Sequence, residues 1–111
     1  MRMNTTEFCR ALADNCAEVA DILAEHMKDN DELLPHVFLA DVTRYVLGDG
    51  KGRAAIVKFL DESFSEYGPD VEELIAVSFV EYLVDPDELS IATKDLDTPR
   101  IVSEWNRQRT S

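Results

Sequence analysis

The chain has little positive charge, and the shortage is concentrated in one third of its length. It holds 11 Lys and Arg against 23 Asp and Glu, for a formal net charge of −12. Residues 61–97 carry twelve acids and one base, whereas residues 1–60 carry ten acids and seven bases, and residues 98–111 carry three Arg and one Glu. Such a field repels nucleic acid and anionic membranes and attracts basic partners. We therefore expect a protein partner, and neither nucleic acid nor membrane.

Long apolar runs are also lacking. No segment approaches the roughly 18 uninterrupted apolar residues that a membrane helix needs. The first fifteen residues contain no apolar stretch of the kind found in secretory signals. The hydrophobic content of 45% is nevertheless ordinary for a globular protein and supplies one core in a chain of 111 residues. We expect a single helical domain over 1–111, located in the cytoplasm.

Cysteine and histidine are scarce, which argues against a disulfide and against a metal site. Cys9 and Cys16 are seven residues apart, about 10 Å along a continuous helix, and a disulfide needs Cα atoms within about 7 Å. Neither belongs to a CxxC motif, and the two histidines, His26 and His36, are not clustered with them. We expect buried thiols, no metal and no cofactor.

Catalytic motifs are lacking as well. His36 and Asp41 could be imagined as an acid–base dyad, but no further residue supports one. Ser78 lies inside an apolar stretch rather than in a GxSxG turn, so a packing role is favoured. The glycine-rich segment 48–52 has neither the spacing nor the hydroxyl of a phosphate-binding loop. The sequence therefore predicts a protein that is not an enzyme.

What the sequence does contain is helical periodicity. Apolar residues recur in steps of three and four from Phe8 to Met27, which is typical of a helix starting at an Asn4–Glu7 capping box. This stripe is either one long helix or, with a break at 14–15, two helices near 5–14 and 16–28. Similar patterns and turn residues predict further helices near 33–47, 52–67, 70–84, 87–92 and 99–108. The expected fold is all-α, with six or seven short helices.

The stretch 70–84 differs from the others because it is apolar on every side between Leu74 and Val84. A helix of this kind packs on more than one side, so we expect it to be the central core helix. The short turns elsewhere favour antiparallel helix pairs around it, in a HEAT-like layout without a sequence repeat. Thr98 followed by Pro99 is expected to cap the last helix.

The surplus acids fall on the outer side of the expected helix 52–67 and at the start of 70–84. The residues that we call the predicted acidic surface are Asp61, Glu62, Glu66, Tyr67, Asp70, Glu72 and Glu73. Charge kept for solubility alone has no reason to collect in one segment, so this surface is a candidate for docking a cationic protein. Tyr67 would supply an aromatic anchor. Two alternatives stay open: a merely solvated face, and an Arg-rich tail (100–109) that folds back onto it.

Two segments carry a family resemblance: LLPHVFLADVTRYV at 33–46 and VEELIAVSFVEYL at 71–83. They resemble a bacterial family of small, acidic, all-helical proteins of uncharacterised function, over about residues 7–84. Its members are similar to immunity proteins, which neutralise polymorphic or contact-dependent growth-inhibition toxins. The resemblance implies a hydrogen-bonded cluster at His36, Asp41 and Arg44, and no catalytic residue.

These observations together predict an immunity-type inhibitor. Its expected partner is a cognate toxin that is basic, a nuclease being one candidate class, and the contact would use the predicted acidic surface. The alternative is a helical adaptor or regulatory module with no toxin partner, whose contacts would be apolar and whose acidic face would serve only solubility.

Overall fold

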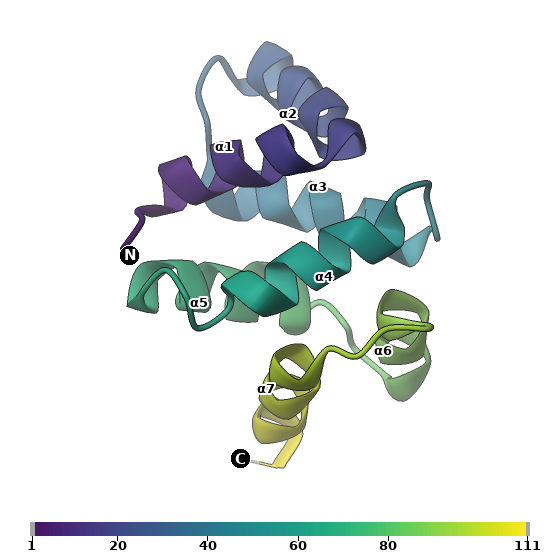
Figure 1. Ribbon diagram of the computed structural model, residues 1–111. Coiled ribbons are helices and arrows are strands. Elements are labelled where there is room, and N and C mark those ends of the chain that lie inside the picture. Colours follow the sequence, from purple (N-terminus) through teal and green to yellow (C-terminus); the bar gives the residue numbers. More distant parts are fainter. Residues whose placement is uncertain (1, 111) are drawn as a thin grey trace.

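The structure is a computed structural model that describes residues 2–110, and all of its regular elements are helical (Figure 1). No helix in this part of the chain is long and apolar enough to cross a membrane. The elements are α1 (Thr5–Asn15), α2 (Ala17–Asn30), α3 (Pro35–Leu47), α4 (Arg53–Ser63), α5 (Pro69–Ile75), the π-helical segment η1 (Ala76–Val80), α6 (Pro86–Thr93) and α7 (Pro99–Thr110). The expected all-α fold and helix number are confirmed.

The first apolar stripe forms two helices. The capping box is present: the side chain of Asn4 accepts the Glu7 N–H at 2.8 Å, and that of Glu7 accepts the Asn4 N–H at 2.9 Å. Cys16 has an extended backbone, with φ of −135°, and separates α1 from α2. Cys9 and Cys16 are free and buried, and burial raises the pKa of the Cys9 thiol to about 12. A thiol with so high a pKa is unreactive at neutral pH.

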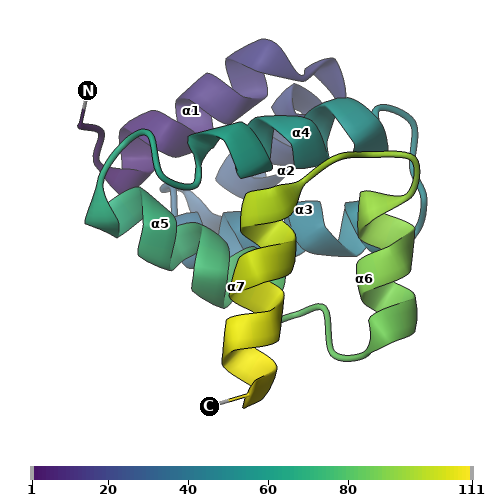
Figure 2. The ribbon, with the colours of Figure 1, turned by 60° about the horizontal axis from the view of Figure 1, so that its bottom comes forward.

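The centre of the molecule is the continuous helix formed by α5 and η1. It packs against α1, α3, α4 and α7 (Figures 1 and 2). Its fully buried side chains include those of Leu74, Ile75 and Phe79, which confirms the expected central helix. The expectation of a regular α-helix to residue 84 is wrong, because the Glu81 N–H bonds the Ala76 carbonyl five residues back, at 2.9 Å. The chain therefore widens into a π turn at the C-terminal end of this helix.

Helix α4 is shorter than the expected 52–67. Its C-terminal end tightens into turns in which N–H groups bond three residues back, from Phe64 to Asp61 and from Glu66 to Ser63. Gly68 then adopts φ of +102°, a conformation that glycine accepts without strain, and Pro69 starts α5. These turns reverse the direction of the chain, so that α5 packs against α4.

Arg53 ties the start of α4 to the end of α6. Its guanidinium is buried and donates to the carbonyls of Ala92 and Lys94, at 2.7 and 3.1 Å, and to the carboxylate of Asp49 at 3.0 Å. The last carbonyls of a helix have no partner inside it, so Arg53 satisfies groups that α6 leaves open.

Asp61 does not lie on the surface, which corrects its placement in the predicted acidic surface. Its side chain is 3% exposed, and its Oδ1 accepts the N–H groups of Arg100 at 2.9 Å and Ile101 at 3.0 Å. These are two of the free N–H groups in the first turn of α7. Thr98 stands at the expected cap position, but its buried hydroxyl has no hydrogen-bond partner within residues 2–110. Asp61, from α4, caps α7 in its place.

We expect Asp61→Ala to lower the free energy of unfolding by about 2–3 kcal/mol, because it removes a helix cap and leaves two buried N–H groups without an acceptor. Urea denaturation followed by circular dichroism measures this. The neighbouring exposed acid supplies the control, since Glu62→Ala should change stability by no more than about 0.5 kcal/mol. Equal effects of the two substitutions would contradict the capping role.

Candidate docking surface

The structure keeps five of the seven predicted acidic-surface residues exposed. These are Glu62 and Glu66 at and beyond the end of α4, and Asp70, Glu72 and Glu73 on α5. Tyr67 is only half-exposed, because its ring packs 6.4 Å from that of Phe8 in the core. Asp61 is buried, as described above. The surface that remains is thus a set of exposed carboxylates, and Tyr67 is too much engaged with the core to serve as a fully exposed aromatic anchor.

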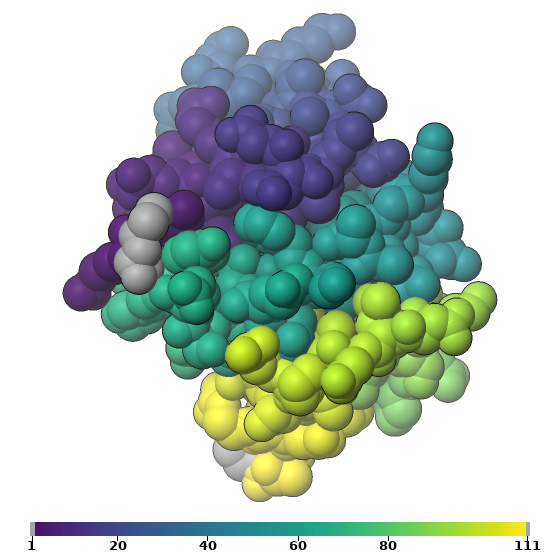
Figure 3. All heavy atoms as spheres, viewed as in Figure 1, coloured from purple at the N-terminus to yellow at the C-terminus, as the bar shows by residue number. Residues whose placement is uncertain are grey.

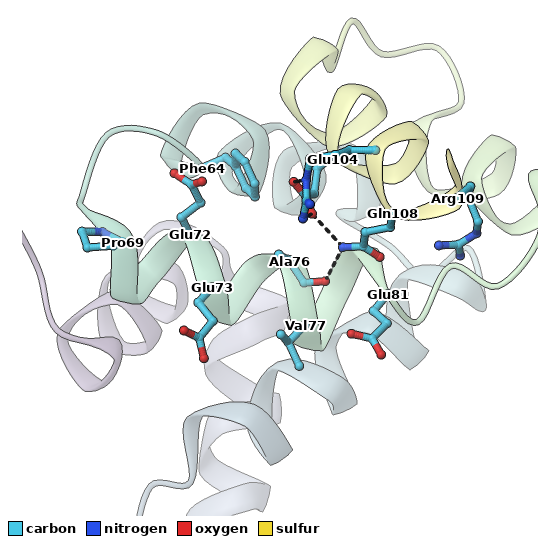
Figure 4. A pocket seen from close by; sticks show the side chains of 11 residues that line it. Phe64, Pro69, Glu72, Glu73, Ala76, Val77, Glu81, Glu104, Gln108 and Arg109 are labelled. Atoms are coloured by element: carbon cyan, nitrogen blue, oxygen red, sulfur yellow. Dashed lines mark hydrogen bonds and ion pairs between the residues drawn. The ribbon is translucent and has the colours of Figure 1, made fainter. Parts of the chain in front are cut away.

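Two hollows divide this surface. The larger, which we call the α5–α7 groove, measures about 640 Å³ and lies between the α5–η1 helix and α7 (Figure 4). The exposed acids that line it are Glu72, Glu73 and Glu81, all on or next to the α5–η1 helix. The smaller, which we call the Tyr67 hollow, measures about 420 Å³ and contains Glu62 and Glu66. Glu81 was missed in the sequence because it follows an apolar run, away from the other acids.

The groove exists because α7 is docked beside η1, at the lower end of the molecule in Figure 3. The Trp105 indole N–H donates to the Leu83 carbonyl at 2.6 Å, and the Gln108 amide donates to the Ala76 carbonyl at 3.1 Å. Ile101 is fully buried on the same helix. The apolar side chains of Ile101 and Trp105 and several polar contacts thus hold α7 across the end of the central helix.

The three arginines of α7 contact groups other than the exposed carboxylates of the two hollows. Arg100 pairs with Asp61 at 3.5 Å, and Arg107 donates to the carboxylate of Glu104 at 2.9 Å. Arg109 donates to the Leu83 carbonyl, and its guanidinium lies 4.6 Å from the centre of the Trp105 ring. The Arg-rich tail therefore folds back onto the rest of the molecule. Within residues 2–110, Asp61 is the one residue of the predicted acidic surface with which it forms an ion pair.

Glu104 is the second acid that α7 uses internally. It is 8% exposed, and the hydrogen bond from Arg107 holds its pKa below the ordinary value of 4.5, although desolvation opposes this shift. The hydrogen bond and charge of Glu104 raise the pKa of Arg107, and the charge of Glu72 adds a smaller contribution across the groove. The negative charge of Glu72 thus interacts electrostatically with the Arg107 guanidinium, without an ion pair between the two side chains.

The exposed acids of the two hollows form no ion pair within residues 2–110. Within residues 2–110, the ion pairs join Arg44 to Asp41, Arg53 to Asp49, Arg100 to Asp61 and Arg107 to Glu104. None of them includes an exposed acid of the two hollows, and within residues 2–110 these acids form no side-chain hydrogen bond. The carboxylates concerned are Glu62, Glu66, Glu72, Glu73 and Glu81. They are available to a cation from another molecule.

The polar residues of α3 do not form the cluster that the resemblance implied. Arg44 pairs with Asp41, but His36 turns to η1, where its Nδ1 lies 2.7 Å from the hydroxyl of Ser78. This distance would suit a nucleophile and base, but Ser78 is 2% exposed and lines none of the hollows described. The contact is a hydrogen bond between the two side chains, and it joins α3 to η1.

His26 is buried between α2 and α3. Its Nε2 accepts the Leu34 N–H at 3.0 Å, at the start of α3. Its ring also meets that of Phe38 edge-on, with centroids 5.8 Å apart. The imidazole thus joins α2 to α3. Residues 2–110 contain no group of three His, Cys, Asp or Glu placed to hold a metal ion.

Comparison with known proteins adds no relative: no family model, no curated protein and no solved structure matches the chain.

The lowered pKa of Glu104 has a consequence for stability. A carboxylate whose pKa falls on folding stabilises the native state above its unfolded pKa, and this contribution disappears as the pH falls through the folded pKa. We therefore expect Glu104→Gln to cost about 1 kcal/mol at pH 7, and the difference from wild type to shrink below pH 4.5. Urea denaturation at several pH values measures this, with Glu62→Gln as the exposed control. A difference that stays constant with pH would contradict the Arg107–Glu104 interaction.

Proposed function

We propose that the chain is an immunity-type inhibitor that binds and neutralises a basic toxin through the acidic residues of its two hollows. The observation that carries the proposal is that the exposed carboxylates there are free of ion pairs within residues 2–110. The nearby arginines of α7 could have neutralised them but bind Asp61, Glu104 and a backbone carbonyl instead.

Unpaired carboxylates in hollows suit binding better than carboxylates on a convex face. A partner cation that enters a hollow loses some of its water, and its attraction to the carboxylates is then screened less by salt than at an open surface. A surface that carries only negative charge also speeds association with a cationic protein and disfavours the binding of anionic proteins. A basic protein partner therefore fits this surface.

The toxin in this proposal comes from the family resemblance. The resembling segments form α3 and the α5–η1 helix, which supply much of the core, so they bear on the fold more than on the partner. A nuclease is one class of basic toxin that fits, because it must present cationic residues to phosphates, and an acidic inhibitor can occupy that same surface.

An adaptor function is favoured by a different observation. Large apolar side chains are exposed at Val37, Val77, Tyr82, Val84 and Ile91. A partner that covers these residues would bind through apolar contact, and its affinity would hardly depend on salt. Salt dependence therefore separates the two functions.

The proposed function is tested by expressing the chain together with the product of the gene that adjoins its own in the source genome. We expect the chain to restore growth of cells that express this neighbour. We also expect the purified complex to weaken by at least about tenfold between 0.1 and 0.5 M NaCl, because the contact is between charges. Absence of protection by the wild-type chain would overturn the toxin-neutralising function, and a complex insensitive to salt would favour the adaptor.

A pair of matched variants tests the surface itself. In the first, four acids of the hollows are neutralised: Glu62→Gln, Glu66→Gln, Glu72→Gln and Glu73→Gln. In the control, four exposed acids of α1, α2 and the turn after α2 are neutralised: Asp14→Asn, Asp21→Asn, Asp31→Asn and Glu32→Gln. Both variants gain the same charge, so a general field effect would weaken them equally. We expect only the first to lose protection, and equal loss would remove the hollows from the mechanism.

A further inference from the structure

We propose that the element of the partner that enters the α5–α7 groove is a basic amphipathic helix, with one cation at Glu73, one at Glu81 and an apolar side chain on Val77. This inference deepens the proposed function and rests on it. It specifies which of the two hollows receives the partner and what kind of segment fits there.

The three groove residues form one stripe. Glu73, Val77 and Glu81 follow one another at intervals of four residues, and Figure 4 shows their side chains leaving the α5–η1 helix on the same side. Glu72 points to the opposite side of this helix, toward Phe64. At roughly 1.5 Å per residue in the α-helical part and less in the π segment, the backbone positions of Glu73 and Glu81 stand at most about 12 Å apart along the helix. They therefore match two cations separated by two turns of a partner helix.

Val77 supplies an observation that is independent of charge. It is 42% exposed although it belongs to the central helix, whose other large apolar residues, such as Phe79 and Val80, are fully buried. It lies within the π turn of η1, and π turns inside α-helices occur frequently at functional sites. An exposed valine between two unpaired carboxylates fits a partner residue that is apolar and flanked by cations.

The opposite side of the groove adds selectivity. Arg107 is held by Glu104, and Arg109 is held by the Leu83 carbonyl and the Trp105 ring, so neither is placed to neutralise the stripe by an ion pair. Arg109 forms no ion pair within residues 2–110, so a cation on the wrong side of the entering helix would face its charge and be repelled. Only a helix whose cations all lie toward the α5–η1 side enters favourably, which describes an amphipathic helix rather than a uniformly basic segment.

The test uses a synthetic helical peptide as the probe, held in shape by a side-chain lactam. The peptide carries Arg at two positions seven residues apart and Leu four residues after the first, which places all three on one face. A peptide of the same composition with these residues on different faces is its control. Binding to the isotope-labelled full chain is followed by NMR, with chemical shifts of the backbone amides as the readout.

We expect saturable shifts confined to residues 72–81 and 104–109. We also expect affinity about tenfold lower in the double variant Glu73→Gln/Glu81→Gln, and within about twofold of wild type in the matched variant Glu62→Gln/Glu66→Gln. Val77→Ser, at a position already exposed, should weaken binding in 0.5 M NaCl as well, since its contact is apolar.

The outcomes separate this inference from the function on which it rests. Shifts centred on the Tyr67 hollow would overturn the groove as the docking site while leaving an acidic docking surface in place. Equal binding by the control peptide would overturn the amphipathic helix as the occupant. The absence of saturable shifts would overturn the groove assignment, and co-expression with the neighbouring gene product then decides independently whether the chain neutralises a toxin.

Discussion

The carboxylate of Asp61 is the contact on which the lower half of the molecule depends. It stands near the end of α4, is almost completely buried, and accepts two N–H groups in the first turn of α7. A buried charge is tolerated only when it is hydrogen-bonded and paired, and here the helix end and Arg100 provide both. Because α7 is fixed at its first turn, its remaining contacts with Leu83 and Ala76 fall beside the central helix.

The position of α7 determines which charges are satisfied inside the protein. Arg107 is directed to Glu104 on its own helix, and Arg109 to Leu83 and Trp105. The carboxylates across the groove, including Glu73 and Glu81, are therefore left without ion pairs within residues 2–110. Asp61 thus contributes to the placement of α7, and the partners of the α7 arginines leave the exposed acids of the groove without ion pairs, which is the basis for the docking function proposed.

Local signals in the sequence predicted most of the helices. The capping box at Asn4 and Glu7 and the Pro99 that starts α7 act through neighbours in the chain, so their consequences are visible without a structure. The starts of α3, α5 and α6 were predicted to within two residues. The all-round apolar stretch likewise predicted the central helix. What failed involved contacts at long range. Asp61 belongs to a polar face by its periodicity, and only the approach of residues 100–101, some forty positions later, buries it.

The candidate site was predictable to a similar extent. The exposure of Glu62, Glu66, Asp70, Glu72 and Glu73 was predicted, since exposed acids on helix surfaces follow from composition and period. Glu81 and Val77 were missed because an apolar run hides them, and their exposure depends on the π turn and on where α7 packs. The contact of His36 with Ser78 joins residues 42 positions apart, and no local pattern indicates it.

The central claim is that Asp61 holds the start of α7 and thereby contributes to its placement beside the groove. Amide hydrogen exchange of Arg100 and Ile101 tests it most directly. The comparison is with His36 and Val37 at the same positions of α3, a helix that also starts with Pro but has no side-chain cap among the described residues. The account predicts slow exchange at Arg100 and Ile101, because Asp61 accepts both N–H groups, and fast exchange at His36 and Val37. Equally fast exchange at all four amides would contradict it.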